Sequence, residues 1–460
     1  MKTLLISISF LISTSVFSQN IVNTLGTSGI FSIKDASSNY LTLTQSNGQV
    51  NILRNLRLEN TTGSGLGVLF KGNERFMHNY GSLNMFIGVN SGNFSMTTDP
   101  GLNTGIGHST LMNLSNGVYN TALGFKALFS NTAGSNNTAL GGNSLLSNTT
   151  GDAITAVGLN TFFNNTTGIN STAVGVNALY NNIDGSYNDA VGVNSLFNNT
   201  SGNSNIALGN RSLFNNTTGD HNIAIGVGAL DSSTTGGSNI GIGANTLNLL
   251  ISGNNNTALG ILSGTLLTSG SNNTVIGYDA ELLTPTTSNQ ITLGNSSISS
   301  LRCNVQTISS LSDMRDKKNI KDLNLGIDFI MKLKPREFNW DKREWYEGNN
   351  SDGSKMSEVP TAGFIAQELD NVQMSQNADW LNLVLKENPD RMEASYGNLL
   401  PVMVKAIQDL KTENDELREE IGQLKTANEK IVKLEQMLNE LTYLKHASLI
   451  ESKENMKNSK

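Results

Sequence analysis

The chain has 460 residues, a formal net charge of −7 and one cysteine, Cys303. This length leaves room for several domains, and a single cysteine excludes an intrachain disulfide. Between residues 83 and 300 the basic residues are Lys126 and Arg211, against eight acids. Nucleic-acid binding is excluded for this segment because phosphate contacts need clustered Lys and Arg. We expect Cys303 to be buried at a domain boundary.

Residues 1–18 have the pattern of a secretory signal peptide: Lys2, an apolar run from Leu4 to Phe17, and a small residue before Gln19. The pattern predicts an exported protein, secreted or held at a bacterial cell surface. No later run reaches the roughly 18 apolar residues that a spanning helix needs, so we expect no transmembrane helix. Residues 19–82 form an N-terminal β-rich region of unknown role. Alternating apolar residues at 30–33 and 41–43 predict short strands there.

Residues 83–300 repeat with a period of 17, marked by a glycine in every copy. A fixed period over many copies predicts a solenoid, in which each coil is stabilised by its neighbours. Ile87-Gly88 is interpreted as an earlier copy displaced by an insertion. The glycines on the repeat are Gly107, Gly124, Gly141, Gly158, Gly175, Gly192, Gly209, Gly226, Gly243, Gly260, Gly277 and Gly294.

Each coil has too few residues for two helices and favours two short strands joined by turns. The first strand is the cassette before the glycine, such as Asn120 to Gly124; the second is the apolar pair that follows, such as Leu128-Phe129. Asn-Thr-Thr-Gly supplies the turn, because Asn and Gly tolerate positive φ. Adjacent apolar residues indicate strands buried on both faces, so the outer face needs a partner. One column of asparagines predicts a side-chain amide ladder: Asn131, Asn148, Asn165, Asn182, Asn199 and Asn216.

The Asn-Thr-Ala-Leu-Gly cassette resembles the head repeats of trimeric autotransporter adhesins, in which three chains wind parallel β-rolls around a common axis. The resemblance covers residues 83–300 and implies a parallel β-roll in a homotrimer. The repeats here are longer than is typical of those heads. No set of amphipathic barrel strands follows them.

Charged residues become dense after Ser312. Four ordered motifs follow: Leu311 to Ile320, Leu333 to Trp340, Gly363 to Leu369 and Tyr396 to Leu399. They resemble the C-terminal intramolecular chaperone domain of phage endosialidases and tail spikes, a self-cleaving serine peptidase domain also found in myelin regulatory factors. The resemblance implies a small α+β domain over residues 301–401.

In that family a serine and a lysine five residues later form a catalytic dyad, which implies Ser312 and Lys317 here and cleavage of the Leu311–Ser312 bond. A serine hydroxyl is a weak nucleophile until a base takes its proton. A lysine is such a base only when neutral, and burial favours the neutral form, so we expect folding to withdraw Lys317 from water. On a helix the two side chains would face apart, so we expect Ser312 outside any helix, at an N-cap. Without the resemblance, Ser312 is a simple cap and Lys317 or Lys318 a solvated charge.

Residues 402–445 have the heptad pattern of a coiled coil, with an irregularity near Ile431, and 446–460 are a polar tail. Asn414 and Asn428 occupy a positions. Leucine at d with asparagine at a favours two strands, whereas the repeats and the family imply three, which we adopt. The seam residues are Met403, Ile407, Leu410, Leu417, Ile421, Leu424, Ile431, Leu434, Leu438 and Leu441.

No other cluster indicates chemistry. The four histidines lack metal-ligand spacing, and Glu368 with Asp370 is interpreted as a solvated helical face. We therefore expect no cofactor and no metal. The hypothesis is an exported, adhesin-like trimeric fibre whose partners are its own copies and a cell-surface glycan or receptor, with a chaperone domain that cuts itself off. The alternatives are a permanent, non-cleaving trimeric cap and a glycan-degrading spike.

Overall fold

The computed structural model describes residues 30–34, 39–44, 49–52, 56–81, 83–97, 101–304, 310–388 and 390–457. The expected signal peptide lies outside these residues. The chain divides into two compact units, Met1–Thr218 and Gly219–Lys460, and each is described by itself. No helix among the described residues combines the length and apolar character that a bilayer-spanning segment needs.

The first unit begins with a small antiparallel sheet in the order β1-β2-β3. Its strands are β1 (Ile30–Lys34), β2 (Asn39–Thr44) and β3 (Gln49–Ile52). The alternating apolar residues at 30–33 and 41–43 therefore lie in strands, as predicted.

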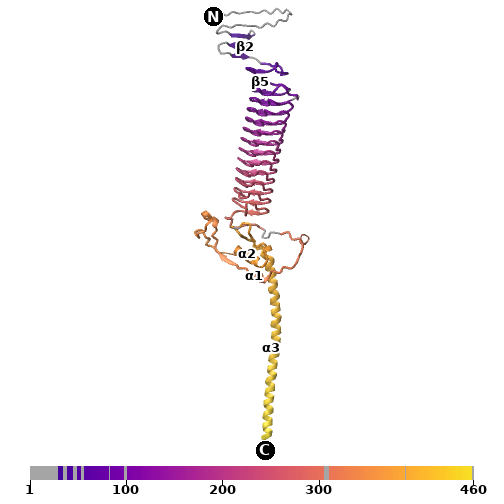
Figure 1. Cartoon of the computed structure of the whole chain (residues 1–460), viewed down its shortest axis with the longest axis vertical. Helices are drawn as coiled ribbons and strands as arrows, with labels where there is room; N and C mark the ends of the chain where they lie inside the picture. Colours follow the sequence, from indigo (N-terminus) through magenta and orange to yellow (C-terminus); the bar gives the residue numbers. More distant parts are fainter. Residues whose placement is uncertain are drawn as a thin grey trace, which may run out of the picture. The chain divides into compact units, whose positions relative to one another are not determined.

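A β-solenoid with one short strand per coil follows (Figure 1). From β7 onward, and within each unit, each strand pairs in parallel with the strand 17 residues away, so that Ala156 lies opposite Ala173, and Ala173 opposite Ala190. The first unit carries β6 (Met85–Ile87), β7 (Thr104–Ile106), β8 (Thr121–Leu123), β9 (Thr138–Leu140), β10 (Thr155–Val157), β11 (Thr172–Val174), β12 (Asp189–Val191) and β13 (Ile206–Leu208). The second unit carries β14 (Ile223–Ile225), β15 (Ile240–Ile242), β16 (Thr257–Leu259), β17 (Thr274–Ile276) and β18 (Ile291–Leu293). The predicted early copy at Ile87-Gly88 is confirmed, since β6 pairs in register with β7.

The prediction of a second strand in each coil is wrong. The apolar pair after the glycine forms a turn, in which Leu128, Leu145 and Leu179 have φ between 52° and 53°. The left-handed backbone costs roughly 1–2 kcal/mol per residue. Burial of the leucine contributes about 1.5–3 kcal/mol, and the Leu179 N–H still donates to Ser195 O of the next coil at 3.0 Å. Burial and the inter-coil hydrogen bond thus offset the cost of a turn that a coil of this length needs.

The predicted amide ladder is confirmed in the buried interior. From Asn148 onward, the Nδ2 of each asparagine donates to the Oδ1 of the asparagine one coil earlier, at 2.7 Å from Asn182 to Asn165 and at 2.8 Å from Asn199 to Asn182. Asn182 Nδ2 also donates to Gly185 O at 2.9 Å, which closes its own turn. Since unsatisfied buried amides are costly, each asparagine fixes the register of the next coil.

The glycine column marks where neighbouring coils approach most closely. From Gly107 to Gly260 its φ angles lie between 133° and 143°, which side chains rarely tolerate. A Cβ on Gly141 would lie 2.2 Å from Gly158 O. Glycine is therefore required at each of these contacts by backbone conformation and by space.

A hairpin of β4 (Leu69–Lys71) and β5 (Glu74–His78) precedes the first coil, and β5 pairs antiparallel with β6. His78 is buried, with Nε2 2.8 Å from Ser91 O, and its Nδ1 accepts from Tyr80 N at 3.2 Å. These contacts fit the neutral ring protonated at Nε2. Burial lowers the pKa of His78 from 6.5 to about 4.

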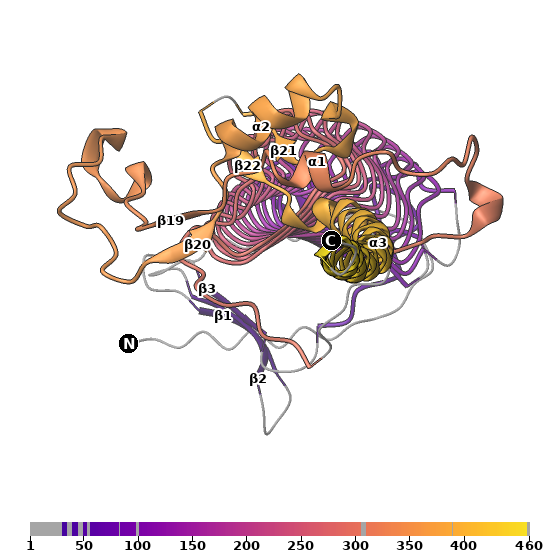
Figure 2. The ribbon, with the colours of Figure 1, turned by 90° about the horizontal axis from the view of Figure 1, so that it is seen from below.

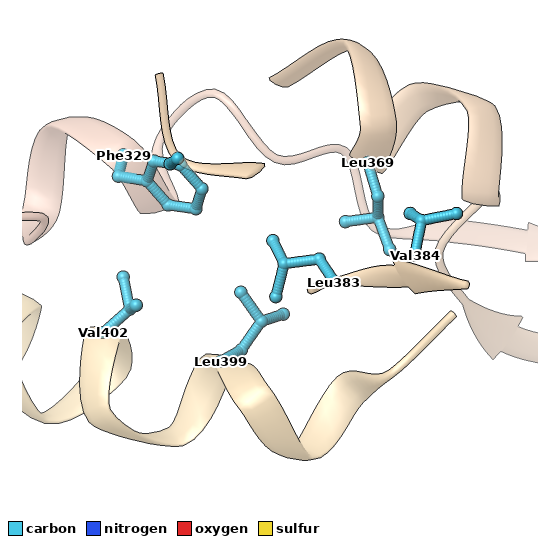
Figure 3. Packing of buried hydrophobic residues seen from close by; sticks show 7 residues of the cluster. Phe329, Leu369, Leu383, Val384, Leu399 and Val402 are labelled. Carbon is cyan, nitrogen blue, oxygen red and sulfur yellow. The ribbon is translucent and has the colours of Figure 1, made fainter. Parts of the chain in front are cut away.

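In the second unit a small α+β region follows the solenoid. Its elements are η1 (Met314–Asp316), α1 (Ile327–Ile330), β19 (Arg336–Phe338), η2 (Arg343–Trp345), η3 (Glu347–Asn349), β20 (Thr361–Gly363), α2 (Ala366–Ser375), η4 (Asp379–Leu381), β21 (Val384–Leu385), β22 (Glu393–Ala394) and η5 (Tyr396–Leu399). Its core joins Phe329, Leu369, Leu383, Leu399 and Val402, with Leu383 and Leu399 pointing toward one another (Figure 3).

The last element is the long helix α3 (Leu400–Lys457), which continues through the first residues of the expected polar tail. Its start packs beside α1 (Figure 2), where Ile327 N donates to Asp409 Oδ2 at 3.4 Å. Beyond Ala406 its side chains are half-buried or exposed. Cys303 is also exposed, contrary to expectation, because the chain around it has left the solenoid without entering another regular element.

We predict that Gly141→Ala loosens the solenoid locally whereas Gly142→Ala does not. The first substitution places a Cβ against backbone at positive φ, which costs about 1–3 kcal/mol for the conformation alone. A Cβ on Gly142 meets one side-chain atom, Leu159 Cδ1, at 3.2 Å. Amide hydrogen exchange of residues 138–160 should accelerate in the first variant and match the wild type in the second. Equal exchange in both would contradict the close-approach argument.

A second prediction concerns pH. Because the pKa of His78 is lower in the folded state, the unfolded state binds more protons between about pH 6.5 and 4. The contribution of His78 to the free energy of unfolding is therefore fully present above pH 6.5 and is lost as the pH falls toward 4. Exchange protection of Glu74–His78, corrected for intrinsic rates, should decrease from pH 7 to pH 5 in the wild type and much less in His78→Gln. An unchanged pH dependence in the variant would rule out His78 as its source.

Candidate catalytic site

The segment that carries Ser312 is an exposed turn built around η1. Asp313 is the N-cap and accepts from Arg315 N at 2.9 Å, while Arg315 Nη2 lies 2.6 Å from Asp313 Oδ2. These hydrogen bonds from Arg315 lower the pKa of the Asp313 carboxyl. Lys317 closes the turn, since its N–H donates to Met314 O at 3.1 Å. The single turn reverses the chain.

This reversal brings the two predicted residues together. Lys317 Nζ lies 2.5 Å from Ser312 Oγ, although five residues separate them. Ser312 and Lys317 are both exposed, and Leu311, which precedes Ser312, is fully exposed. Ser312 lies outside any helix, as expected, but the cap of the turn is Asp313. The expected burial of Lys317 is absent from the single chain.

The other motifs build the framework of the region. In β19, Arg336 forms a two-pronged ion pair with Glu368 of α2, with Nε–Oε2 at 2.9 Å and Nη2–Oε1 at 2.5 Å. Tyr396 Oη accepts from Phe364 N at 3.0 Å, and a Cβ on Gly363 would lie 2.8 Å from this oxygen. The motif at 363–369 therefore contacts both of the others: Glu368 pairs with Arg336 of the motif at 333–340, and Phe364 binds Tyr396 of the motif at 396–399.

Glu368 and Asp370 of α2, interpreted from the sequence as a solvated helical face, are half-buried, and each forms an ion pair. Arg336 lowers the pKa of Glu368 by hydrogen bonding, and Lys386 does the same for Asp370 at 2.7 Å. Buried Gln373 donates to Asp370 Oδ1 at 2.9 Å and accepts from Leu383 N at 3.0 Å. Sequence patterns could not reveal these partners, because they come from segments distant in the chain.

An open cleft of about 980 Å³ lies beside β19 and η5, lined by Trp340, Arg343, Phe364, Arg391 and Tyr396 among others. Ser312 and Lys317 do not line it. The described residues contain no group of three or more His, Cys, Asp or Glu that could hold a metal ion. The contact between Lys317 Nζ and Ser312 Oγ places an amine beside a hydroxyl.

Comparison with known proteins identifies the segment that starts at Ser312. Residues 312–378 match the family model described as chaperone of endosialidase. No curated protein and no solved structure matches the chain. The match covers the Ser312–Lys317 turn, the β19–β20 pair and helix α2. Residues 312–378 are therefore similar to the chaperone-of-endosialidase family, and in the sequence they follow a β-solenoid of 17-residue repeats.

Proposed function

We propose that the protein is an exported, adhesin-like trimeric fibre whose chaperone domain directs assembly and then cuts the Leu311–Ser312 bond once. The contact between Lys317 Nζ and Ser312 Oγ at 2.5 Å, at the first residues of the matched domain, carries this proposal. The exported location rests on the signal-like residues 1–18. The repeated Asn and Thr exterior suits binding of a glycan or receptor.

The proposed cleavage balances without a cofactor. Neutral Lys317 takes the proton of the Ser312 hydroxyl as Oγ attacks the Leu311 carbonyl carbon. The bond from that carbon to the Ser312 nitrogen breaks, and the nitrogen leaves as an amine with the proton from Lys317. Water then hydrolyses the resulting ester, giving a carboxylate on Leu311 and restoring the Ser312 hydroxyl. The site acts once, because its substrate is its own chain.

Exposure of Lys317 in the single chain links cleavage to assembly. A lysine in water stays largely charged, and removal from water favours the neutral base. We infer that neighbouring copies cover Lys317 when the trimer forms. The unassembled chain then keeps its chaperone domain, and the assembled one loses it.

Helix α3 supports association of the copies. Leu417, Leu424 and Leu438 are 51%, 62% and 64% exposed. They lie on the seam expected from the heptads, and a helix that exposes such a seam is stabilised mainly by packing against others. We propose that three α3 helices form a coiled coil.

The alternatives differ in what they require. A permanent cap keeps the fold and the trimer but leaves Leu311–Ser312 intact. A glycan-degrading spike requires paired carboxylates in a groove, and residues 83–300 contain only eight acids. Single-turnover cleavage is favoured because the Ser312–Lys317 contact is present.

We predict that the wild-type chain, expressed alone, yields a fragment ending at Leu311 and another beginning at Ser312. Ser312→Ala removes the nucleophile and Lys317→Ala removes the base, so each should leave a full-length chain that still forms trimers. Lys318→Ala is the matched control, because Lys318 is also exposed, and it should be cleaved normally. Denaturing gels with N-terminal sequencing distinguish these outcomes. Normal cleavage of Ser312→Ala would refute the dyad.

A further prediction concerns the order of events. Pairing three long repeat regions requires slow, non-local contacts, whereas a helical seam brings the chains together locally. A chain ending at Leu311 should therefore give aggregates or monomers, while fibre from which residues 312–460 were lost after folding should remain trimeric. Sedimentation of both samples measures whether the chains are monomers, trimers or aggregates. Soluble trimers at normal yield from the truncated chain would show that the chaperone domain is dispensable.

A further inference from the structure

One face of the solenoid carries an exposed apolar surface in successive coils. In β11 and β12 the last strand residue and the residue two positions later point outward: Val174, Val176, Val191 and Val193, which are 37%, 40%, 42% and 43% exposed. We call these two columns the apolar face. The second unit carries equivalent residues, such as Leu259 and Ile261 at 47% and 52%.

Two other outward columns make contacts within their own chain from coil to coil. Phe163, Tyr180, Phe197 and Phe214 stack ring on ring, with centroids 4.9, 5.1 and 5.3 Å apart. Beside them, Asn164 donates to Asn181 at 3.0 Å and Asn181 to Asn198 at 3.1 Å. By contrast, the side chains of the apolar face repeat from coil to coil and stay exposed to solvent, from 37% at Val174 to 43% at Val193.

The regular spacing of the apolar face limits the kind of partner that can cover it. Val174 lies directly opposite Val191 in the parallel register, so the columns advance by one strand per coil. A partner that covers them must present apolar groups at the same spacing along many coils, as another copy of this solenoid does. A globular partner covers a compact patch, and an anionic membrane surface favours flanking Lys or Arg, of which residues 83–300 have two.

We propose that copies of this chain pack through the apolar face, with their coils in register. The aromatic column that contains Phe163 and the asparagine column that contains Asn164 stay on the outside. The proposal rests on the trimeric fibre proposed above and adds the face that forms its interior. It also explains why isolated solenoids would aggregate, since each would expose apolar side chains in many of its coils.

Site-directed cross-linking of the full chain tests the assignment. In a Cys303→Ser background, cysteine replaces either Val176 on the apolar face or Thr167, an exposed residue away from it. A short bismaleimide should convert most of the Val176→Cys chain into covalent dimers, independently of dilution, and leave Thr167→Cys as single chains. No cross-linking at Val176, or equal cross-linking at both positions, overturns the proposal.

Sedimentation of the same samples separates this inference from the proposed function. A monomeric chain would defeat both, whereas a trimer that does not cross-link at Val176 would defeat only the apolar-face assignment. Val176→Lys gives a second readout, because it places an unpaired charge in the proposed interior. It should lower the temperature at which the fibre trimer dissociates, while Thr167→Lys should leave that temperature unchanged.

Discussion

Hydrogen bonding between coils at a fixed separation of 17 residues is the constraint on which the rest of the structure depends. Backbone groups pair from strand to strand, and Asn182 and its equivalents repeat the same register inside the coil. Glycines such as Gly141 allow the backbones to meet where a Cβ would collide. A shift of one residue would break the backbone ladder, the amide ladder and the glycine contacts together.

This constraint has a consequence for assembly. The interior of a coil holds asparagine amides, small residues such as Ala156 and one large apolar side chain such as Leu179, whereas other apolar residues, such as Val176, point outward. In the proposed trimer, copies that match these columns over many coils could mispair by whole repeats, because every repeat is nearly alike. A separate domain that aligns the chains at one end would remove this ambiguity, which is the physical role we propose for residues 312–460.

Much of the fold was predictable because the glycine period and the asparagine column are local, repeated signals. The second strand was predicted wrongly because Leu128-Phe129 has strand composition, whereas the left-handed conformation of Leu128 depends on its burial and on the neighbouring coil. The prediction that Cys303 is buried failed for a related reason, since burial depends on what packs around a segment. Ser312 and Lys317 were predicted as a dyad from the resemblance of their motif, and their roles stay a prediction. The Asp313–Arg315 pair that shapes their turn was not predicted, because an exposed ion pair at this spacing is common in any sequence.

We propose that cleavage of the Leu311–Ser312 bond follows assembly of the chains. Native mass spectrometry of the wild-type chain, sampled while it refolds, reports the assembly state and the cleavage state of each molecule together. The account predicts that intact trimers accumulate first and then convert to cleaved fibre, with intact monomers remaining uncut. Cleaved monomers that precede any trimer, or trimers that stay intact indefinitely, would contradict it.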